Sequence, residues 1–316
     1  MHNSFTLSVN LSPGDVKYAE ITAAKLAEHH TIIPNRLLVV DCCKPQKTKL
    51  VNPAIRFPEP YFTERCEEII NISHSLIKNG YYNQLFILKP NSPIFKHLSK
   101  KYLNNVIKST HGAGGTAQMA YWAGIELANT RYVLHYDGDI ILHQKKDYFW
   151  WLEAVEAMSQ NEKAIFAIPR HAPPSVNTKG MPTLSEGTEI IEYDSFWLHN
   201  WFSTRFFLLD KVRLTPFLPL VSGKLLFELL VRKYLMRSFP LDPEIILFRT
   251  LGQSKGMRRL ILKSENAWAL HPHSKPVEFI DMIKDIYDSV HAGRYPIEQG
   301  GLEELNLKAW SSFIKI

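Results

Sequence analysis

The sequence lacks most of the features that mark specialised protein classes. Only three of its 316 residues are cysteines, Cys42, Cys43 and Cys66, and no Cys-x-x-Cys pair occurs. This excludes a disulfide framework and gives no structural zinc site, so reduced thiols in a cytoplasmic protein are the simplest interpretation. Fifteen glycines and nineteen prolines, with no Gly/Ser-rich linker or internal repeat, exclude collagen-like and low-complexity chains.

Long uncharged hydrophobic runs are also missing. The most apolar window, residues 212–231, contains Arg213, Lys224, Glu228 and two prolines, which excludes an ordinary membrane-spanning helix. The first fifteen residues have no basic segment ahead of their short apolar stretch, so we expect no signal peptide. We therefore expect a soluble protein or one bound peripherally to a membrane surface.

Charge is modest overall but unevenly distributed. Lys and Arg number 37 against 31 Asp and Glu, and residues 205–263 hold twelve of the basic side chains against four acidic ones. The basic excess favours anionic partners, but no nucleic-acid reader motif accompanies it, so we expect no nucleic acid partner. Residues 224–237 mix leucines with basic side chains. They form either a core-packed helix with a solvated basic face or a helix that contacts acidic lipid.

The first half of the chain alternates short apolar runs with helical periodicity. This order predicts an α/β fold with a mostly parallel sheet, in which ligands bind beyond the carboxyl ends of the strands. The predicted strands are residues 5–11, 36–43, 84–89, 105–110 and 131–136. The predicted helices are residues 15–30, with Asp15 as the cap, 63–78, and 116–129, with Thr116 as the cap.

The second half is less regular. Residues 169–192 are rich in Pro, Gly, Ser and Thr, which predicts a loop. We predict strands at residues 164–168, 204–209 and 258–263, and helices at 147–160, 224–236, 243–251, 277–291 and 301–313.

The sharpest chemical signal is YVLHYDGDIIL, residues 132–142, in which Asp137 and Asp139 flank Gly138 directly after a buried strand. Two carboxylates at this spacing can face one divalent cation, and glycine permits close approach of a ligand. The alternative is a solvated surface turn. The glycine-rich loop 112–115 is not followed by Gly-Lys-Ser/Thr, so it predicts a tight turn, with phosphate contact as the second possibility.

Three segments together resemble the nucleotide-binding half of GT-A glycosyltransferases. They are FTLSVNL (5–11), RLLVVDCC (36–43) and HGAGGTAQMAYWAGIELANTRYVLHYDGD (111–139). The sequence is most similar to the large inverting family 2, which includes polysaccharide and lipid-linked sugar transferases. The resemblance implies a Rossmann-like sheet with helices on both faces, a less regular acceptor side, and a nucleoside-diphosphate sugar donor. It implies donor contacts from Asn10, Asp41, Gly115, Asp137 and Gly138.

The resemblance also implies a Mn²⁺ or Mg²⁺ ion held by Asp137 and Asp139, with His271 as a third ligand. For His271 the alternative is a hydrogen-bonded structural histidine, and His135 is interpreted as a satisfied core histidine. The chain departs from the family at Tyr121-Trp122, where many members have Arg-Asn, and at the residues after Asp41. The Gln-x-x-Arg-Trp element of processive members is absent, which favours transfer of a single sugar.

An inverting transfer needs a carboxylate base, and Asp242 and Glu244 stand where the family places one. We slightly favour Asp242, whose alternative role is to cap a helix that starts at Pro243. Trp197, His199 and Trp201 are candidates for acceptor contact, with core packing as the alternative.

Together these features predict a metal-dependent, inverting glycosyltransferase of bacterial type, cytoplasmic or peripheral at the inner membrane face. It would use a UDP-sugar and a carbohydrate or lipid-linked acceptor. Residues 1–145 would bind the nucleotide sugar, 146–270 would form the acceptor and catalytic half, and 271–316 a helical extension. The alternatives are a sugar-phosphate nucleotidylyltransferase, for which the loop after residue 11 lacks the expected Arg and Lys, and a non-catalytic nucleotide-sugar-binding protein.

Overall fold

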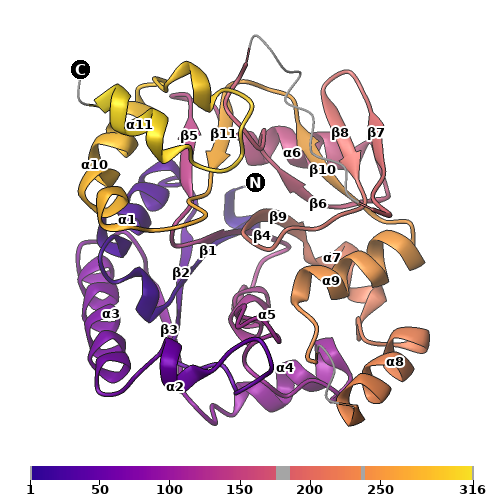
Figure 1. Cartoon of the computed structure of the whole chain (residues 1–316). Coiled ribbons are helices and arrows are strands. Elements are labelled where there is room, and N and C mark those ends of the chain that lie inside the picture. The colour runs from indigo at the N-terminus through magenta and orange to yellow at the C-terminus, as the bar shows by residue number, and fades with distance from the viewer. Residues whose placement is uncertain (1, 176–185, 236–238, 315–316) are drawn as a thin grey trace.

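A nine-stranded sheet runs through the molecule in the order β3-β2-β1-β4-β9-β6-β10-β8-β7 (Figure 1). This computed structural model describes residues 2–175, 186–235 and 239–314. Within them, only β8 and β9 run against the other strands of this sheet, so the predicted α/β fold with a mostly parallel sheet is confirmed. The strands are β1 (Phe5–Leu11), β2 (Asn35–Asp41), β3 (Gln84–Leu88), β4 (Tyr132–Asp137), β6 (Ala164–Ile168), β7 (Ile190–Glu192), β8 (Phe196–His199), β9 (Phe206–Asp210) and β10 (Arg258–Leu262).

The central strands are hydrophobic along their whole length because both of their faces are covered. Every residue of β1 and β6 is buried, as expected for strands between two layers of helices. An added Cβ on Gly124 would lie 2.6 Å from Ser8 Oγ, so the helix of Gly124 packs directly on one face of β1. This helix is α5, and Figure 1 shows it on one side of β1–β3, with α1 and α3 on the other.

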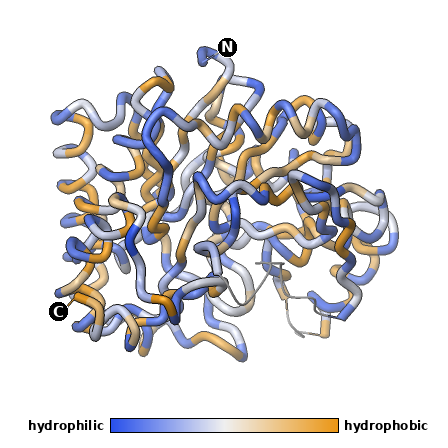
Figure 2. Tube along the Cα trace, turned by 90° about the horizontal axis from the view of Figure 1, so that it is seen from above, coloured by the Kyte–Doolittle hydropathy of each residue, from blue (hydrophilic) through white to orange (hydrophobic). Residues whose placement is uncertain are grey.

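The longer peripheral helices are amphipathic, whereas α5 is apolar nearly all round and buried. Figure 2 shows hydrophilic and hydrophobic residues interleaved along the chain. None of the helices in the described residues is long and apolar enough to cross a membrane. They are α1 (Ala19–His29), α2 (Pro53–Arg56), α3 (Tyr61–Lys78), α4 (Ile94–Leu103), α5 (Met119–Leu127), α6 (Trp150–Ser159), α7 (Lys211–Leu214), α8 (Gly223–Tyr234), α9 (Pro243–Leu247), α10 (Val277–His291) and α11 (Leu307–Ile314).

A second, smaller sheet joins the late part of the chain to the first half. Strand β5 (Ile141–Gln144) follows the acidic turn after β4 and pairs antiparallel with β11 (Ala267–Leu270). A separate apolar core forms around this pair and includes Tyr18, Trp268 and Trp310. The chain that leaves β11 is thereby fixed beside the end of β4.

The predicted strand at residues 105–110 is wrong. Helix α4 ends at Leu103, and Asn104 and Asn105 both have positive φ, which turns the chain sharply. Both neighbouring positions of β1 are filled by β2 and β4. The apolar residues Val106 and Ile107 are buried without strand pairing.

Several predicted helix boundaries are also corrected. The first helix begins at Ala19, because Pro13–Asp15 forms a separate 3₁₀ turn capped by Ser12. The helix predicted from Thr116 begins at Met119, and the one predicted over 243–251 is α9 followed by a π-helix, Phe248–Ser254. The predicted loop 169–192 ends in strand β7, and its residues 176–185 lie outside the described residues.

Candidate functional site

A cleft of about 360 Å³ opens at the carboxyl ends of β1, β2 and β4. The register of the sheet makes Asn10 and Asp137 direct partners on neighbouring strands, and Asp41 ends the strand on the other side of β1. Ligands in parallel sheets bind at this edge. The residues predicted from the sequence that line the cleft are Asn10, Asp41, Gly115, Asp137, Gly138 and Asp139.

The turn Asp137–Asp139 is packed tightly against the end of β1. An added Cβ on Gly138 would lie 2.4 Å from Leu11 Cδ2 and 3.0 Å from the carbonyl oxygen of Asn10. The Asp137 amide donates to the carbonyl of Arg205 at 2.7 Å. Because Asp139 is only 5% exposed, the alternative of a solvated surface turn is wrong.

Asp139 is the most strongly paired acid of the cleft. Its Oδ2 forms an ion pair with Lys275 Nζ and lies 3.4 Å from His271 Nε2, while its Oδ1 is buried without a hydrogen-bond partner. Burial alone would raise the pKa of Asp139, but the hydrogen bond from His271 and the charge of Lys275 hold it below its usual range. The orphaned Oδ1 is therefore an ionised oxygen available to a ligand.

Asp137 is held by an aromatic hydroxyl instead of a basic residue. Tyr121 Oη donates to its Oδ2 at 2.9 Å, so the residue that departs from the family pattern contacts the acidic motif directly. Burial and the charge of Asp139 raise the pKa of Asp137 well above its usual range. His135 Nε2 lies 3.5 Å from Asp137 Oδ1 and has no hydrogen-bond partner, so His135 is not the satisfied core histidine we predicted.

Asn10 and Asp41 bring further unpaired polar atoms to the cleft. Neither amide atom of Asn10 has a partner, although the residue is buried. Asp41 Oδ1 accepts from the Cys43 amide at 2.9 Å, while its Oδ2 is unpartnered and 3.9 Å from His111 Nε2. Burial raises the pKa of Asp41 to about 6. Buried polar atoms are normally hydrogen-bonded, so this group is suited to bind a polar ligand.

Sequence reasoning missed two charged residues of the cleft. Asp15, interpreted as a helix cap, accepts from Ser12 N and Oγ at 2.7 and 2.9 Å and faces the same space as Asp139. Lys275 comes from the chain after β11, and its only sequence signal is its position four residues after His271. The cleft is therefore lined by four carboxyl groups, those of Asp15, Asp41, Asp137 and Asp139, and by two basic side chains, those of Arg56 and Lys275.

A cleft lined by four carboxyl groups can hold a diphosphate only with added positive charge. No cluster of three or more His, Cys, Asp or Glu side chains in the described part of the chain is arranged for a metal ion. Magnesium-type sites, however, use one or two carboxylates and take further ligands from substrate phosphates and water. The unpartnered Oδ1 of Asp139 and the adjacent Asp137 fit such a site.

Asp242 and Glu244 do not line this cleft. Asp242 is the N-cap residue of α9, with Pro243 at the first helical position as the capping alternative predicted, but its side chain makes no capping hydrogen bond. Asp242 Oδ1 has no hydrogen-bond partner among the described residues. It packs against the turn that leads to Gly115, so closely that a Cβ added to Gly112 would lie 1.9 Å from it. Glu244 accepts from the Thr204 amide at 2.8 Å.

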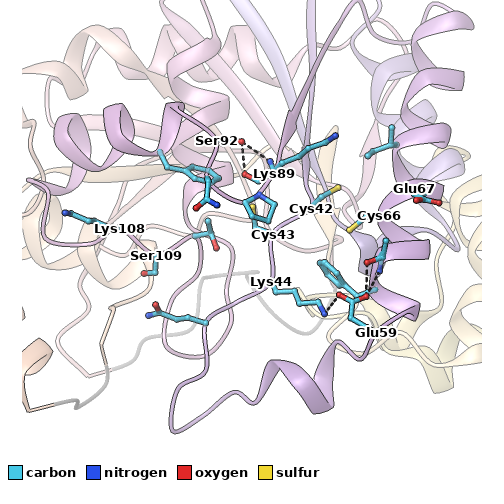
Figure 3. Close-up of a pocket in the computed structure, with 18 residues that line it drawn as sticks. Cys42, Cys43, Lys44, Glu59, Cys66, Glu67, Lys89, Ser92, Lys108 and Ser109 are labelled. Carbon is cyan, nitrogen blue, oxygen red and sulfur yellow. Dashed lines mark hydrogen bonds and ion pairs between the residues drawn. The ribbon is translucent and has the colours of Figure 1, made fainter.

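A second cavity of about 740 Å³ adjoins the cleft and shares Cys43 and Phe62 with it (Figure 3). Figure 3 shows the sulfur atoms of Cys42 and Cys66 turned toward one another and the Lys44–Glu59 ion pair at the rim. All three cysteines are free thiols, as predicted.

The sequence matches no protein-family model and is similar to no curated protein. Among solved structures, the galactosyltransferase LgtC in complex with donor and acceptor sugar analogues aligns with 80% of this chain and 72% of its own, at 9% identity and a TM-score of 0.36. Apo mouse xyloside xylosyltransferase 1 aligns with 82% of this chain and 84% of its own, at 13% identity and a TM-score of 0.38. At this level of similarity, the chemistry of the cleft has to be inferred from its own residues.

Proposed function

We propose that this protein is a GT-A-type glycosyltransferase that moves one sugar from a nucleoside-diphosphate donor, UDP in the first instance, to an acceptor hydroxyl with inversion. The supporting observation is that Asn10, Asp41 and the Asp137–Asp139 turn, distant in sequence, line one cleft at the carboxyl edge of a parallel sheet. Four of their buried polar atoms lack hydrogen-bond partners within the described residues: Asn10 Nδ2 and Oδ1, Asp41 Oδ2 and Asp139 Oδ1.

For the donor, we propose that Asn10 and Asp41 hold the ribose and base, and that Gly115 and Gly138 bring backbone close to the diphosphate. A Mn²⁺ or Mg²⁺ ion bound through Asp137 and Asp139, with His271 beside them, would supply Lewis-acid stabilisation of the departing diphosphate. Lys275 and Tyr121 orient these two carboxylates, since each already binds one of them.

For the transfer itself, we propose Asp242 as the base that takes the proton of the acceptor hydroxyl. Burial raises its pKa, which suits proton acceptance near neutral pH, and its Oδ1 is free of hydrogen bonds. Glu244 is the second candidate, but its bond to Thr204 favours a role in holding the segment before β9.

The decisive experiment compares wild type with Asp139→Asn and with Asp285→Asn, a control on the exposed face of α10. We expect UDP-sugars with Mn²⁺ to raise the melting temperature and to be turned over by wild type and the control, but not by Asp139→Asn. Synthesis of UDP-sugar from UTP and a sugar 1-phosphate would instead identify a nucleotidylyltransferase. Donor binding by wild type without hydrolysis or transfer to any acceptor tested would favour a non-catalytic binding protein.

We also propose that α8 contacts an acidic membrane surface. Phe227, Leu230, Val231 and Tyr234 follow the i, i+3, i+4, i+7 spacing and are 72, 38, 40 and 86% exposed. Only Leu225 and Leu229 of this helix are buried. The alternative of a core-packed helix is therefore correct only for the narrow face that these two leucines form. Along the sequence of α8, basic residues are interspersed with these apolar ones, a composition typical of interfacial helices. The basic residues are Lys224, Arg232 and Lys233. Residues 236–237 of the predicted contact lie outside the described residues.

A further inference from the structure

A cluster of basic side chains lies buried on the far half of the sheet, away from the residues that line the cleft. Arg259 on β10 is paired across the strands with His199 on β8, and His171 follows the end of β6. These three side chains are 7, 3 and 8% exposed. Such burial is unusual for a guanidinium group, which is almost never buried without a partner.

Arg259 has no counter-ion among the described residues. No carboxylate oxygen lies within 4.0 Å of its guanidinium, in contrast to Arg131, which bonds Asp210 through two nitrogens. Among residues 2–175, 186–235 and 239–314, its one hydrogen bond joins Nη2 to His199 Nδ1 at 3.4 Å, and its Nε is buried without an acceptor. The charges of Glu303 and Glu244 reach Arg259 only from a longer range. An unpaired buried cation costs free energy that an anion bound from outside would recover.

The two histidines share this lack of partners. His171 Nδ1 and His199 Nε2 are both buried without a hydrogen bond. Burial and the charge of Arg259 lower the pKa of His171 to about 4 and that of His199 to about 3, so both rings are neutral at pH 7. A neutral imidazole can donate one N–H, and the guanidinium supplies a planar set of donors that fits the oxygens of a phosphate or carboxylate.

The chain joins the cluster to the candidate base residues, which lie outside the cleft. His199 ends β8, and Thr204, five residues later, donates its amide to Glu244 at 2.8 Å. Glu244 follows Asp242 at the start of α9. The cluster is therefore tied to the segment where we propose that the acceptor hydroxyl is deprotonated.

We propose that Arg259, His171 and His199 form a binding site for an anionic group, a phosphate or a carboxylate, carried by the acceptor. The anion site itself stands independently, and only its assignment to the acceptor rests on the proposed glycosyl transfer. Arg170, the residue before His171, is anchored through its Nη1 to the carbonyl of Lys263 at 2.9 Å.

The test measures binding of inorganic phosphate, glucose 6-phosphate, glucuronate and neutral glucose by calorimetry and by thermal shift. The variant is Arg259→Met, which keeps most of the side-chain volume, and the control is Arg65→Met on α3, where the guanidinium lies over the ring of Tyr61. We expect wild type and control to bind at least one anionic probe but not glucose, and Arg259→Met to bind that probe at least tenfold more weakly. Preference between glucose 6-phosphate and glucuronate identifies the anionic group.

A second readout separates a ligand role from a structural one. Removal of an unpaired buried charge should leave the melting temperature of Arg259→Met without anion equal to or above that of wild type. Saturating UDP should not displace the probe, because the donor would occupy the other cleft. If no anion binds, if Arg259→Met binds the probe as wild type does, or if UDP displaces the probe, the proposal is overturned. Anion binding without any response to UDP-sugars would instead overturn the glycosyltransferase proposal and leave the anion site in place.

Discussion

At the scale of single residues, Asp41 combines a structural cost with a proposed binding role. Burial raises its pKa from 3.8 to about 6, so the carboxylate form disfavours folding. The contribution of Asp41 to the free energy of unfolding is therefore fully present below pH 3.8. This contribution is lost as the pH rises through 6.

We expect Asp41→Asn to raise the free energy of unfolding at pH 7 by up to about 3 kcal/mol, from about two pKa units at 1.36 kcal/mol each. The gain over wild type should shrink between pH 6 and pH 4, measured by urea denaturation. Asp285→Asn, an exposed control, should show neither change. UDP binding should weaken in Asp41→Asn alone. A constant stability difference across this pH range would contradict the assignment.

Gly138 is a second residue whose substitution has a definite outcome. Alanine there would bring its Cβ within 3.0 Å of both Leu11 and the Asn10 carbonyl, so the acidic turn must move. We expect Gly138→Ala to lose about 1–3 kcal/mol of stability, as in other overpacked sites, and to abolish response to UDP-sugars with Mn²⁺. Gly114→Ala, which meets nothing within 4 Å and has no positive φ, is the matched control and should retain that response.

At the scale of elements, α8 makes the membrane proposal testable. Vesicles rich in phosphatidylserine should pellet the protein at low salt, and neutral vesicles should not. Replacing both Phe227 and Tyr234 by Ser should weaken this binding at least tenfold, because a buried aromatic side chain contributes about 1.5–3 kcal/mol. The control is Ile55→Ser, which removes an equally exposed apolar residue on α2. Equal pelleting of all three proteins would refute the contact.

The helices and strands whose apolar residues pack on the core were predicted well from the sequence. The strands at residues 5–11 and 164–168 and the helix at 277–291 agree at both ends, because their apolar periodicity reflects direct packing on the core. The false strand at 105–110 has only two apolar residues, Val106 and Ile107, which are buried without strand pairing. Asn104 and Asn105, at its start, turn the chain away from the sheet. The spacing of hydrophobic residues in a sequence does not reveal such turns.

The candidate site was predictable only in part, for a related reason. Asn10, Asp41 and Asp137 could be placed because each ends a recognisable strand, and strand ends meet at one edge. Lys275 and Arg259 could not, since their significance depends on contacts between segments far apart in the chain. Nothing in the local sequence of Arg259 distinguishes a buried, unpaired arginine from an exposed one.

At the scale of the whole molecule, the C-terminal segment completes the cleft. Trp310 is fully buried and donates from Nε1 to Gln299 Oε1 at 3.0 Å, and Gln299 in turn binds the carbonyls of Leu302 and Glu304. The next residue, Leu305, donates to the carbonyl of His271 at 3.0 Å. This path of hydrogen bonds links α11 to His271 within the segment 271–316, which we predicted as a helical extension.

We expect Trp310→Ala to cost about 3–5 kcal/mol of stability and to weaken UDP-sugar binding of the folded protein, because His271 and Lys275 lose their support. Trp151→Ala, which removes a tryptophan buried equally well on α6, should cost as much stability. It should leave donor affinity unchanged at temperatures where both variants are folded, as measured by calorimetric titration. Equal affinity in the two variants would show that the C-terminal segment does not shape the cleft.

The order in which these residues occur along the chain has a consequence during protein synthesis. During synthesis the strands that carry Asn10, Asp41 and Asp137 emerge first, whereas the lysine that balances their charge follows much later. A nascent chain would thus expose a cluster of acids without this counter-ion until Lys275 has left the ribosome. Removal of residues 271–316 would return the finished protein to that unfinished state and leave every strand of the central sheet in the chain.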